Sequence, residues 1–168
     1  MTWSKERRRS HAVARAQRRA NADDLRRSAL RVARLALSAP GLVAEHVDDL
    51  LHYAIWKLSE ADYPKYHLPT RTKRAHKEIL LGGSLQKRLR HEHVYQRAEV
   101  VRRARALAGK GSVAVALKYI EEHADACVVH KAEAAKLDKV PGFGWKRYEQ
   151  FNVHEFREGE LRLVRPRT

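Results

Sequence analysis

A long segment without helix breakers constrains the first part of the chain more than any other feature. Residues 4–37 contain neither glycine nor proline and consist largely of alanine, arginine and leucine, which favour helices. Apolar residues recur at helical spacing from Leu25 to Ala36, which predicts an amphipathic helix over residues 22–37. Residues 1–21 are less apolar, and we expect a basic arm or a helical extension there.

Glycines and prolines divide the rest of the chain into shorter elements. With 168 residues, the chain is long enough for one domain with its own core. We expect a mainly α fold with a small α+β region. A single domain would span 22–168, with a compact strand and helix module at about 85–168 that ends in a hairpin. The pattern predicts helices over 42–60, 71–81, 97–107, 113–123, 131–138 and 145–151, and strands over 89–95, 126–129, 153–156 and 161–164.

The charge is strongly positive and unevenly distributed. Lys and Arg number 35 and Asp and Glu number 20, which gives a net charge of +15. Residues 1–37 carry 11 basic and 3 acidic side chains, and residues 71–110 carry 12 and 3. Because a small domain rarely needs a net charge above about 8 for solubility, the excess indicates a polyanionic partner: DNA, RNA or an anionic membrane surface.

We expect these two basic blocks to bind DNA or RNA through the phosphate backbone, since the planar fork of arginine suits phosphate groups. Two alternatives use the same charge differently. The protein could be a small basic inhibitor that binds an acidic protein partner, or the helices could present a solvated face without a ligand. The residues expected to contact nucleic acid are Arg7, Arg8, Arg9, Arg18, Arg19, Arg26, Arg27, Arg71, Lys73, Arg74, Lys87, Arg88, Arg90, Arg97, Arg102 and Arg103.

Cysteine content and hydropathy bear on the compartment. The single cysteine, Cys127, excludes an internal disulfide and a multi-cysteine zinc site, which fits a reducing environment. The longest apolar runs are far below the ~20 residues of a membrane span. The N-terminus lacks the apolar core of a secretory signal. We therefore expect a cytoplasmic protein without a membrane span.

Two histidines and a carboxylate stand side by side in the second basic block, at His91, Glu92 and His93. A carboxylate can hold a hard divalent cation, and a neighbouring histidine can act as a base toward water. Such a cation stabilises the leaving oxygen of a phosphodiester. His130 and Glu133 are the best candidates for the other half of the site, because they share a helical face.

The stretch Leu89–Val94, followed later by Ala126–Val129 and a short helix, resembles the His-Asn-His (HNH) nucleases with their ββα-metal site. The chain also resembles small bacterial proteins in which a His-Glu-His-Val stretch precedes a Cys-Val-Val strand and a Gly-Trp-x-x-Tyr segment, which here begins at Gly144. The resemblance covers about residues 85–150. It implies a diverged member, because the chain has no asparagine between residues 22 and 151 and Gln96 stands at a position that is usually proline.

That resemblance implies roles for the residues around the histidine pair. Glu92 and His93 would be catalytic, with His93 as the general base, and Glu92, His91 and His130 would hold Mg²⁺, Mn²⁺ or Zn²⁺. The chain would then be a metal-dependent endonuclease. Two readings without catalysis remain open: a degenerate nuclease-like fold that only binds nucleic acid, and a strand whose histidines bond to backbone or phosphate.

Overall fold

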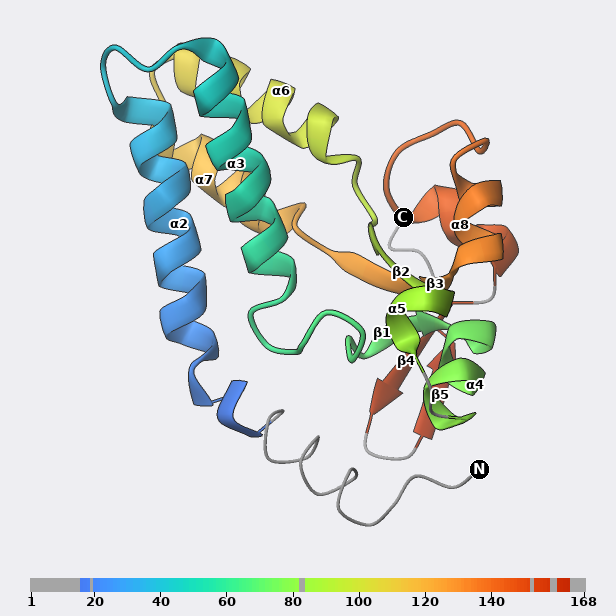
Figure 1. Ribbon diagram of the computed structural model, residues 1–168. Coiled ribbons are helices and arrows are strands. Elements are labelled where there is room, and N and C mark those ends of the chain that lie inside the picture. Colours follow the sequence, from blue (N-terminus) through green and yellow to red (C-terminus); the bar gives the residue numbers. More distant parts are fainter. Residues whose placement is uncertain (1–15, 19, 82–83, 152, 158–159, 164–168) are drawn as a thin grey trace.

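The structure, a computed structural model, describes residues 16–18, 20–81, 84–151, 153–157 and 160–163 (Figure 1). It is mainly helical with a small sheet, as predicted from the sequence. The helices are α2 (Ala22–Ser38), α3 (Ala44–Ser59), α4 (Lys73–Leu81), α5 (Leu85–Arg88), α6 (Arg97–Gly109), α7 (Val113–Glu122), α8 (Lys131–Leu137) and the 3-10 helix η1 (Gly144–Phe151). The strands are β1 (Thr70–Thr72), β2 (Leu89–His93), β3 (Ala126–His130), β4 (Val153–Arg157) and β5 (Glu160–Leu163).

Four helices, α2, α3, α6 and α7, pack into one cluster that lies beside the sheet (Figure 1). The face of α2 that is buried here consists of small residues, among them Ala29 and Ala33, and α3 contributes the larger Leu51 and Ile55. Small side chains on one helix let the other approach closely while large ones fill the space between them. The amphipathic pattern read from the sequence therefore forms a continuous apolar core.

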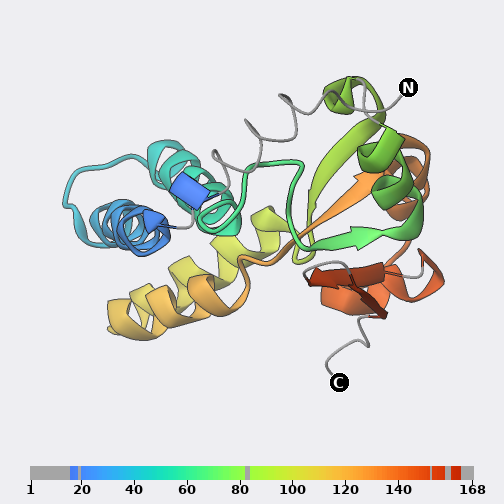
Figure 2. The same cartoon turned by 90° about the horizontal axis from the view of Figure 1, so that it is seen from below.

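The strands form one sheet in the order β2-β3-β1-β4-β5. β1 runs parallel to β3, and the remaining pairs are antiparallel, including the predicted terminal hairpin of β4 and β5. Helices α4, α5 and α8 lie around this sheet, on the side of the molecule away from the four-helix cluster (Figure 2). β2 is thus an edge strand, and its histidines lie at the border of the sheet.

The chain passes between the helical cluster and the sheet three times: from α3 to β1, from β2 to α6 and from α7 to β3. Tyr95 lies in the second of these crossings and packs against the cores of both parts. Its ring also contacts His123 and Phe143, with centroid distances of 4.6 and 5.0 Å. The histidine stretch therefore leads directly into the junction of the two parts.

One predicted helix start is wrong. Thr70 does not cap a helix over 71–81, because Thr70–Thr72 forms β1 and the helix begins at Lys73. Thr72 caps the N-terminus of this helix, because its Oγ1 accepts a hydrogen bond from the Ala75 amide at 3.1 Å. As a result the sheet extends further toward the N-terminus than the predicted α+β region of about 85–168.

None of the helices in the described ranges is long and apolar enough to cross a membrane.

Candidate functional site

The alternation of β2 sends its side chains to opposite faces of the sheet edge. His91 pairs with Val128 and His93 with Ala126, so these histidines share a face, as predicted. Glu92 pairs with Cys127 and projects to the other face, as does its neighbour Arg90. The two predicted catalytic residues, Glu92 and His93, therefore leave the strand in opposite directions.

A pocket of about 500 Å³ wraps around this edge, and we call it the edge pocket. Side chains reach it from α3, β2, the first turn of α6, the end of α8 and η1. It therefore lies where the helical cluster meets the sheet. Its lining residues are His52, Arg90, His91, Glu92, His93, Gln96, Arg97, Ala98, Asp138 and Arg147.

The histidine rings of β2 are largely enclosed and sit nearly perpendicular to each other, 5.0 Å apart between centroids. Burial, helped by Lys65 and Arg97, lowers the pKa of His91 to about 4. Burial, with smaller effects of His91 and Arg97, lowers the pKa of His93 to about 3. Both imidazoles are therefore neutral at physiological pH.

The third histidine of the edge pocket, His52, projects from α3. Burial and, to a smaller extent, Arg97 lower its pKa as well, while Asp48 and Asp49 oppose the shift. The Nδ1 atoms of His52 and His93 are buried and have no hydrogen-bond partner within the described part of the chain. Buried polar atoms are usually paired, so such atoms mark a place where a ligand or water completes the site.

The carboxylates of the edge pocket are engaged by one arginine. Arg90 forms ion pairs with Glu92 and with Asp138, the latter at 3.1 Å between Nη1 and Oδ2. Burial raises the pKa of the Glu92 carboxyl, and Arg90 acts against that shift. Arg90 offsets one of these two negative charges, and Arg97 and Arg147 also line the pocket, so three arginines stand against two carboxylates.

The predicted metal ligands do not come together. His130 pairs with Leu89, two residues from His91 and four from His93 along β2; at roughly 3.3 Å per residue these offsets are ~7 and ~13 Å. Glu92 projects to the opposite face of the strand. His130 caps α8 instead: its Nδ1 accepts from the Ala132 amide at 3.1 Å. Glu133 accepts from the His130 amide at 2.9 Å. Among the residues described, no group of three or more His, Cys, Asp or Glu side chains could hold a metal ion.

A second hollow, of about 750 Å³, lies between α4, α8 and the end of η1, and we call it the basic hollow. Lys73, Arg74 and Lys77 project from α4, and Lys136 joins them from α8; all four are exposed. The parallel pairing of β1 with β3 places α4 and α8 next to each other, because each helix directly follows its strand. The remaining lining residues are His76, Leu80, Glu133, Gln150 and Phe151.

The acidic residue of the basic hollow is already engaged. Glu133 Oε2 accepts the Thr72 hydroxyl at 2.6 Å in addition to the His130 amide. The four cations form no ion pair with another described residue. Phe151 is half-buried at the rim and packs against the core of the sheet. The hollow therefore combines available positive charge with a partly exposed aromatic ring.

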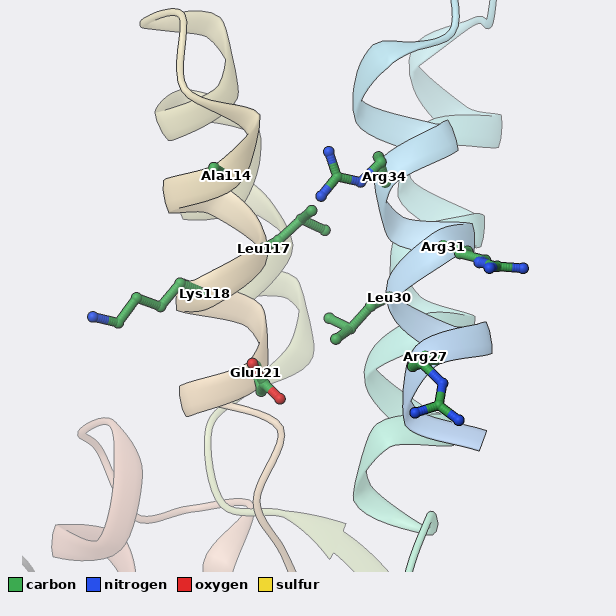
Figure 3. Close-up of a pocket in the computed structure, with 8 residues that line it drawn as sticks. All are labelled: Arg27, Leu30, Arg31, Arg34, Ala114, Leu117, Lys118 and Glu121. Atoms are coloured by element: carbon green, nitrogen blue, oxygen red, sulfur yellow. The ribbon is translucent and has the colours of Figure 1, made fainter. Parts of the chain in front are cut away.

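A third depression, of about 470 Å³, runs between α2 and α7. Figure 3 shows Leu30 and Leu117 pointing toward each other across it, while Arg34 reaches over it and Arg31 extends away. Both arginines are exposed. Because its floor is apolar, this groove differs from the basic hollow, where charged groups from two helices surround the space.

Several of the predicted phosphate contacts are engaged within the protein. Arg71 is a correction: it lies in a central strand of the sheet and is only 5% exposed, so it cannot reach a nucleic-acid backbone. Arg18 donates to the Glu60 carbonyl at 3.0 Å, and Arg26 pairs with Asp62. The further pairs are Arg27 with Asp24, Arg88 with Glu78, Arg90 with Glu92 and Asp138, and Arg102 and Arg103 with Glu99.

The other predicted contacts fall into two groups. Lys73, Arg74 and Lys87 are exposed and without an ion pair to another described residue, while Arg97 lines the edge pocket. The residues that lie outside the described ranges are Arg7, Arg8, Arg9 and Arg19.

Sequence reasoning missed three residues of these sites. No local pattern marks His52, because only the packing of α3 against α6 brings it to β2. Arg147 is a charged residue in a predicted helix, yet it is 5% exposed and donates through Nη2 to the Leu137 carbonyl at 3.0 Å. Lys136 joins the basic hollow through strand pairing, which leaves no local signal in the sequence.

Comparison with known proteins finds no matching family model, no matching curated protein and no matching solved structure. The resemblance to the HNH nucleases therefore rests on the short motifs of the sequence alone.

Proposed function

We propose that this protein binds nucleic acid and that the basic hollow between α4 and α8 is its principal contact with the phosphate backbone. The observation that carries the proposal is the group of four exposed cations, Lys73, Arg74, Lys77 and Lys136, around a space whose one carboxylate is occupied. Cations that are not paired within the protein can release counterions from a nucleic acid without first giving up a partner.

The aromatic ring favours nucleic acid over an acidic protein as the ligand. Phe151 stands at the rim of the hollow beside Gln150. A base can stack on such a ring while the lysines contact the flanking phosphates, an arrangement common in proteins that bind single strands. An acidic peptide would use the cations but would gain less from the ring.

A metal-dependent endonuclease has less support. Of the side chains expected to bind the metal, Glu92 projects to the opposite face of β2 from His91, and His130 is used with Glu133 as the cap of α8. A hydrolytic role for His93 would need ligands other than the ones predicted.

The test compares two variants that remove the same amount of charge. The first carries Lys73→Gln, Arg74→Gln, Lys77→Gln and Lys136→Gln, which changes the hollow. The control carries Arg102→Gln, Arg103→Gln, Arg105→Gln and Lys118→Gln, which changes exposed cations that are ion-paired to Glu99, Asp48 and Glu122. Fluorescence anisotropy with labelled duplex DNA, single-stranded DNA and single-stranded RNA gives the affinity over a range of salt concentrations.

The hollow variant should lose affinity on the order of 100-fold, and the slope of log K against log salt should fall by about 3, since each phosphate contact contributes roughly one unit. The control should lose less than about tenfold. Equal losses in both variants would mean that net charge alone drives binding. A response that does not depend on salt, or displacement by polyglutamate at equal charge concentration, would overturn the proposal, and the second result would point to an acidic protein partner.

A further inference from the structure

The edge pocket has the charge of an anion site. Its lining includes three arginines, Arg90, Arg97 and Arg147, against the two carboxylates of Glu92 and Asp138, and the excess of one cation makes the pocket positive when its histidines are neutral. The positive charge of Arg97 contributes to the lowered pKa of all three histidines of the pocket. A metal ion would meet the repulsion of these arginines, but an anion would offset it.

The N-terminus of a helix opens into the same space. Gln96, Arg97 and Ala98 line the pocket and form the start of α6, a helix of 13 residues. Gln96 occupies the N-cap position and makes no side-chain cap hydrogen bond to another described residue. The first amides of a helix lack partners within the helix, and together with the helix dipole they bind phosphate and similar oxyanions.

A buried and incompletely bonded arginine also lines the edge pocket. Arg147 is 5% exposed, and its Nε has no hydrogen-bond partner among the described residues, although Nη2 donates to the Leu137 carbonyl. The buried Nδ1 atoms of His52 and His93 are unpartnered in the same way. Helix amides, guanidinium groups and neutral imidazoles that can each donate one N–H thus converge from α3, α6, β2 and η1.

We propose that the edge pocket binds a phosphate monoester, with its phosphoryl group at the N-terminus of α6 between Arg97 and Arg147. The fork of a guanidinium matches two phosphate oxygens, and the helix amides suit the third. The volume of about 500 Å³ exceeds what a phosphate ion needs and falls in the range of sites for small organic ligands, so the pocket holds part of the esterified group as well.

This site shares no lining residue with the basic hollow. The inference therefore does not depend on the nucleic-acid binding proposed above, and the two can fail separately. Two sources of the ligand share the chemistry: a free nucleoside monophosphate and the phosphorylated end of a nucleic-acid strand.

Isothermal titration calorimetry of the full chain with adenosine monophosphate, inorganic phosphate and adenosine tests the proposal. Adenosine monophosphate should bind more tightly than inorganic phosphate, and adenosine should not bind. Arg97→Gln should weaken binding at least about tenfold, because it removes a charge-assisted contact. Lys139→Gln removes the same charge from an exposed position outside the pocket and should leave the affinity unchanged.

Gln96→Asp separates loss of the site from loss of the fold. Aspartate is a preferred N-cap residue, so it should keep or raise the melting temperature while its carboxylate competes for the helix amides. We expect at least about a tenfold loss of affinity for adenosine monophosphate. Full affinity in Gln96→Asp and Arg97→Gln, or binding of adenosine as tight as that of its monophosphate, would overturn the proposal.

A single-stranded oligonucleotide with a 5′-phosphate or a 5′-hydroxyl identifies the source. Tighter binding of the phosphorylated strand that disappears in Gln96→Asp assigns the site to strand ends. Equal binding of both strands, together with binding of adenosine monophosphate, assigns it to the free nucleotide.

Discussion

The two parts of the molecule, the four-helix cluster and the sheet with its helices, differ in how many polar side chains they bury. The core of the four-helix cluster consists of aliphatic side chains from α2, α3, α6 and α7. The sheet part buries Arg71, Thr72, His76, Glu92 and Arg147, whereas the buried carboxylate of the helical part, Glu60, ends α3 and accepts a hydrogen bond from Trp56. Burying a polar or charged group costs free energy unless it is fully paired. This cost is therefore concentrated in the sheet part, which lines both proposed binding sites.

The exposed cations of the two parts also differ in how often they form ion pairs with carboxylates. Several cations of the helical cluster have carboxylate partners, as in Arg102 with Glu99 and Arg105 with Asp48, whereas the exposed Arg31 and Arg34 of α2 form no ion pair with another described residue. Around the sheet, the cations of the basic hollow have none among the described residues. Composition places most positive charge on Arg-rich helices, but availability for a ligand is set by which cations the fold leaves unpaired.

The largest expected effect tests whether the two parts unfold together. Leu51 belongs to the helical core and Leu137 to the sheet core, and both are fully buried. Leu51→Ala and Leu137→Ala should each lower the free energy of unfolding by about 3 kcal/mol. Because Tyr95 packs against both cores, we expect one cooperative transition in urea, followed by circular dichroism and tryptophan fluorescence.

Leu35→Ala is the control, because Leu35 is 63% exposed on α2; its effect should stay within about 0.5 kcal/mol. Two separate transitions, each shifted by only one of the core variants, would show that the parts are independent domains.

A smaller effect is expected at the junction. Gly144 has a φ of +73°, and a Cβ added there would lie 2.7 Å from Cε1 of Tyr95. Gly144→Ala should therefore destabilise the protein by about 2 kcal/mol, from backbone strain and displacement of the tyrosine ring. Gly41→Ala has a similar φ of +83° but open space around the Cβ, so it isolates the backbone cost of about 1 kcal/mol. Equal thermal shifts in both variants would contradict a tight junction at Tyr95.

Local sequence patterns were sufficient for most of the fold. The helix over 22–37 and its end are readable because apolar residues repeat every three to four positions and Pro40 and Gly41 interrupt them. β1 was missed because Thr70–Thr72 is too short to show alternation. Strand pairing also stays hidden, since partners such as Arg71 and Val128 lie far apart in the sequence and nothing local links them.

The candidate site was predictable only in part, for the same physical reason. The sequence shows a motif of adjacent ionisable residues, His91, Glu92 and His93. The shared face of the two histidines follows from the alternation of side chains along a strand. Their surroundings depend on tertiary packing, which brings His52 and Arg147 to them and leaves His130 at the other end of the strand pair. The sequence therefore identified the position of the pocket, but the side chains that it assigned to a metal do not form a metal-binding group among the described residues.

The neutral histidines of the edge pocket predict a pH dependence of stability. The folded pKa values of His91 and His93, about 4 and about 3, lie below the value of 6.5 expected in the unfolded chain. As pH falls below that value, the unfolded chain takes up protons that the folded protein does not. Stability should thus decrease by about 1 kcal/mol per histidine between about pH 7 and pH 5.5.

Replacing both histidines by asparagine should flatten this part of the curve of unfolding free energy against pH, as measured by urea denaturation. His46→Gln changes an exposed histidine of α3 and should leave the slope as it is. The measurement is confined to pH values near neutral because burial raises the pKa of Glu92. In acid, the folded protein therefore takes up a proton at Glu92 before the unfolded chain does, which increases stability and opposes the effect of the histidines. An unchanged slope in the double variant would mean that the two rings are protonated in the folded state.

The smallest expected effect tests whether ion pairs with Glu99 prevent Arg102 and Arg103 in the helical cluster from contacting nucleic acid. Hydrogen bonds from Arg102 and then Arg103 hold the pKa of the Glu99 carboxyl well below its usual range. Glu99→Gln releases both arginines without removing either. Because exposed ion pairs contribute little to stability, the melting temperature should move by less than about 3 °C.

If Arg102 and Arg103 of α6 do not contact nucleic acid, the affinity of Glu99→Gln for DNA or RNA should rise by less than about threefold, through the change in net charge alone. Glu122→Gln is the matched control, since it frees one exposed lysine of α7. A gain of tenfold or more in Glu99→Gln alone would place α6 in the nucleic-acid interface. In that case the pairing of Arg102 and Arg103 with Glu99 would limit binding, and the basic hollow would not be the principal contact with nucleic acid.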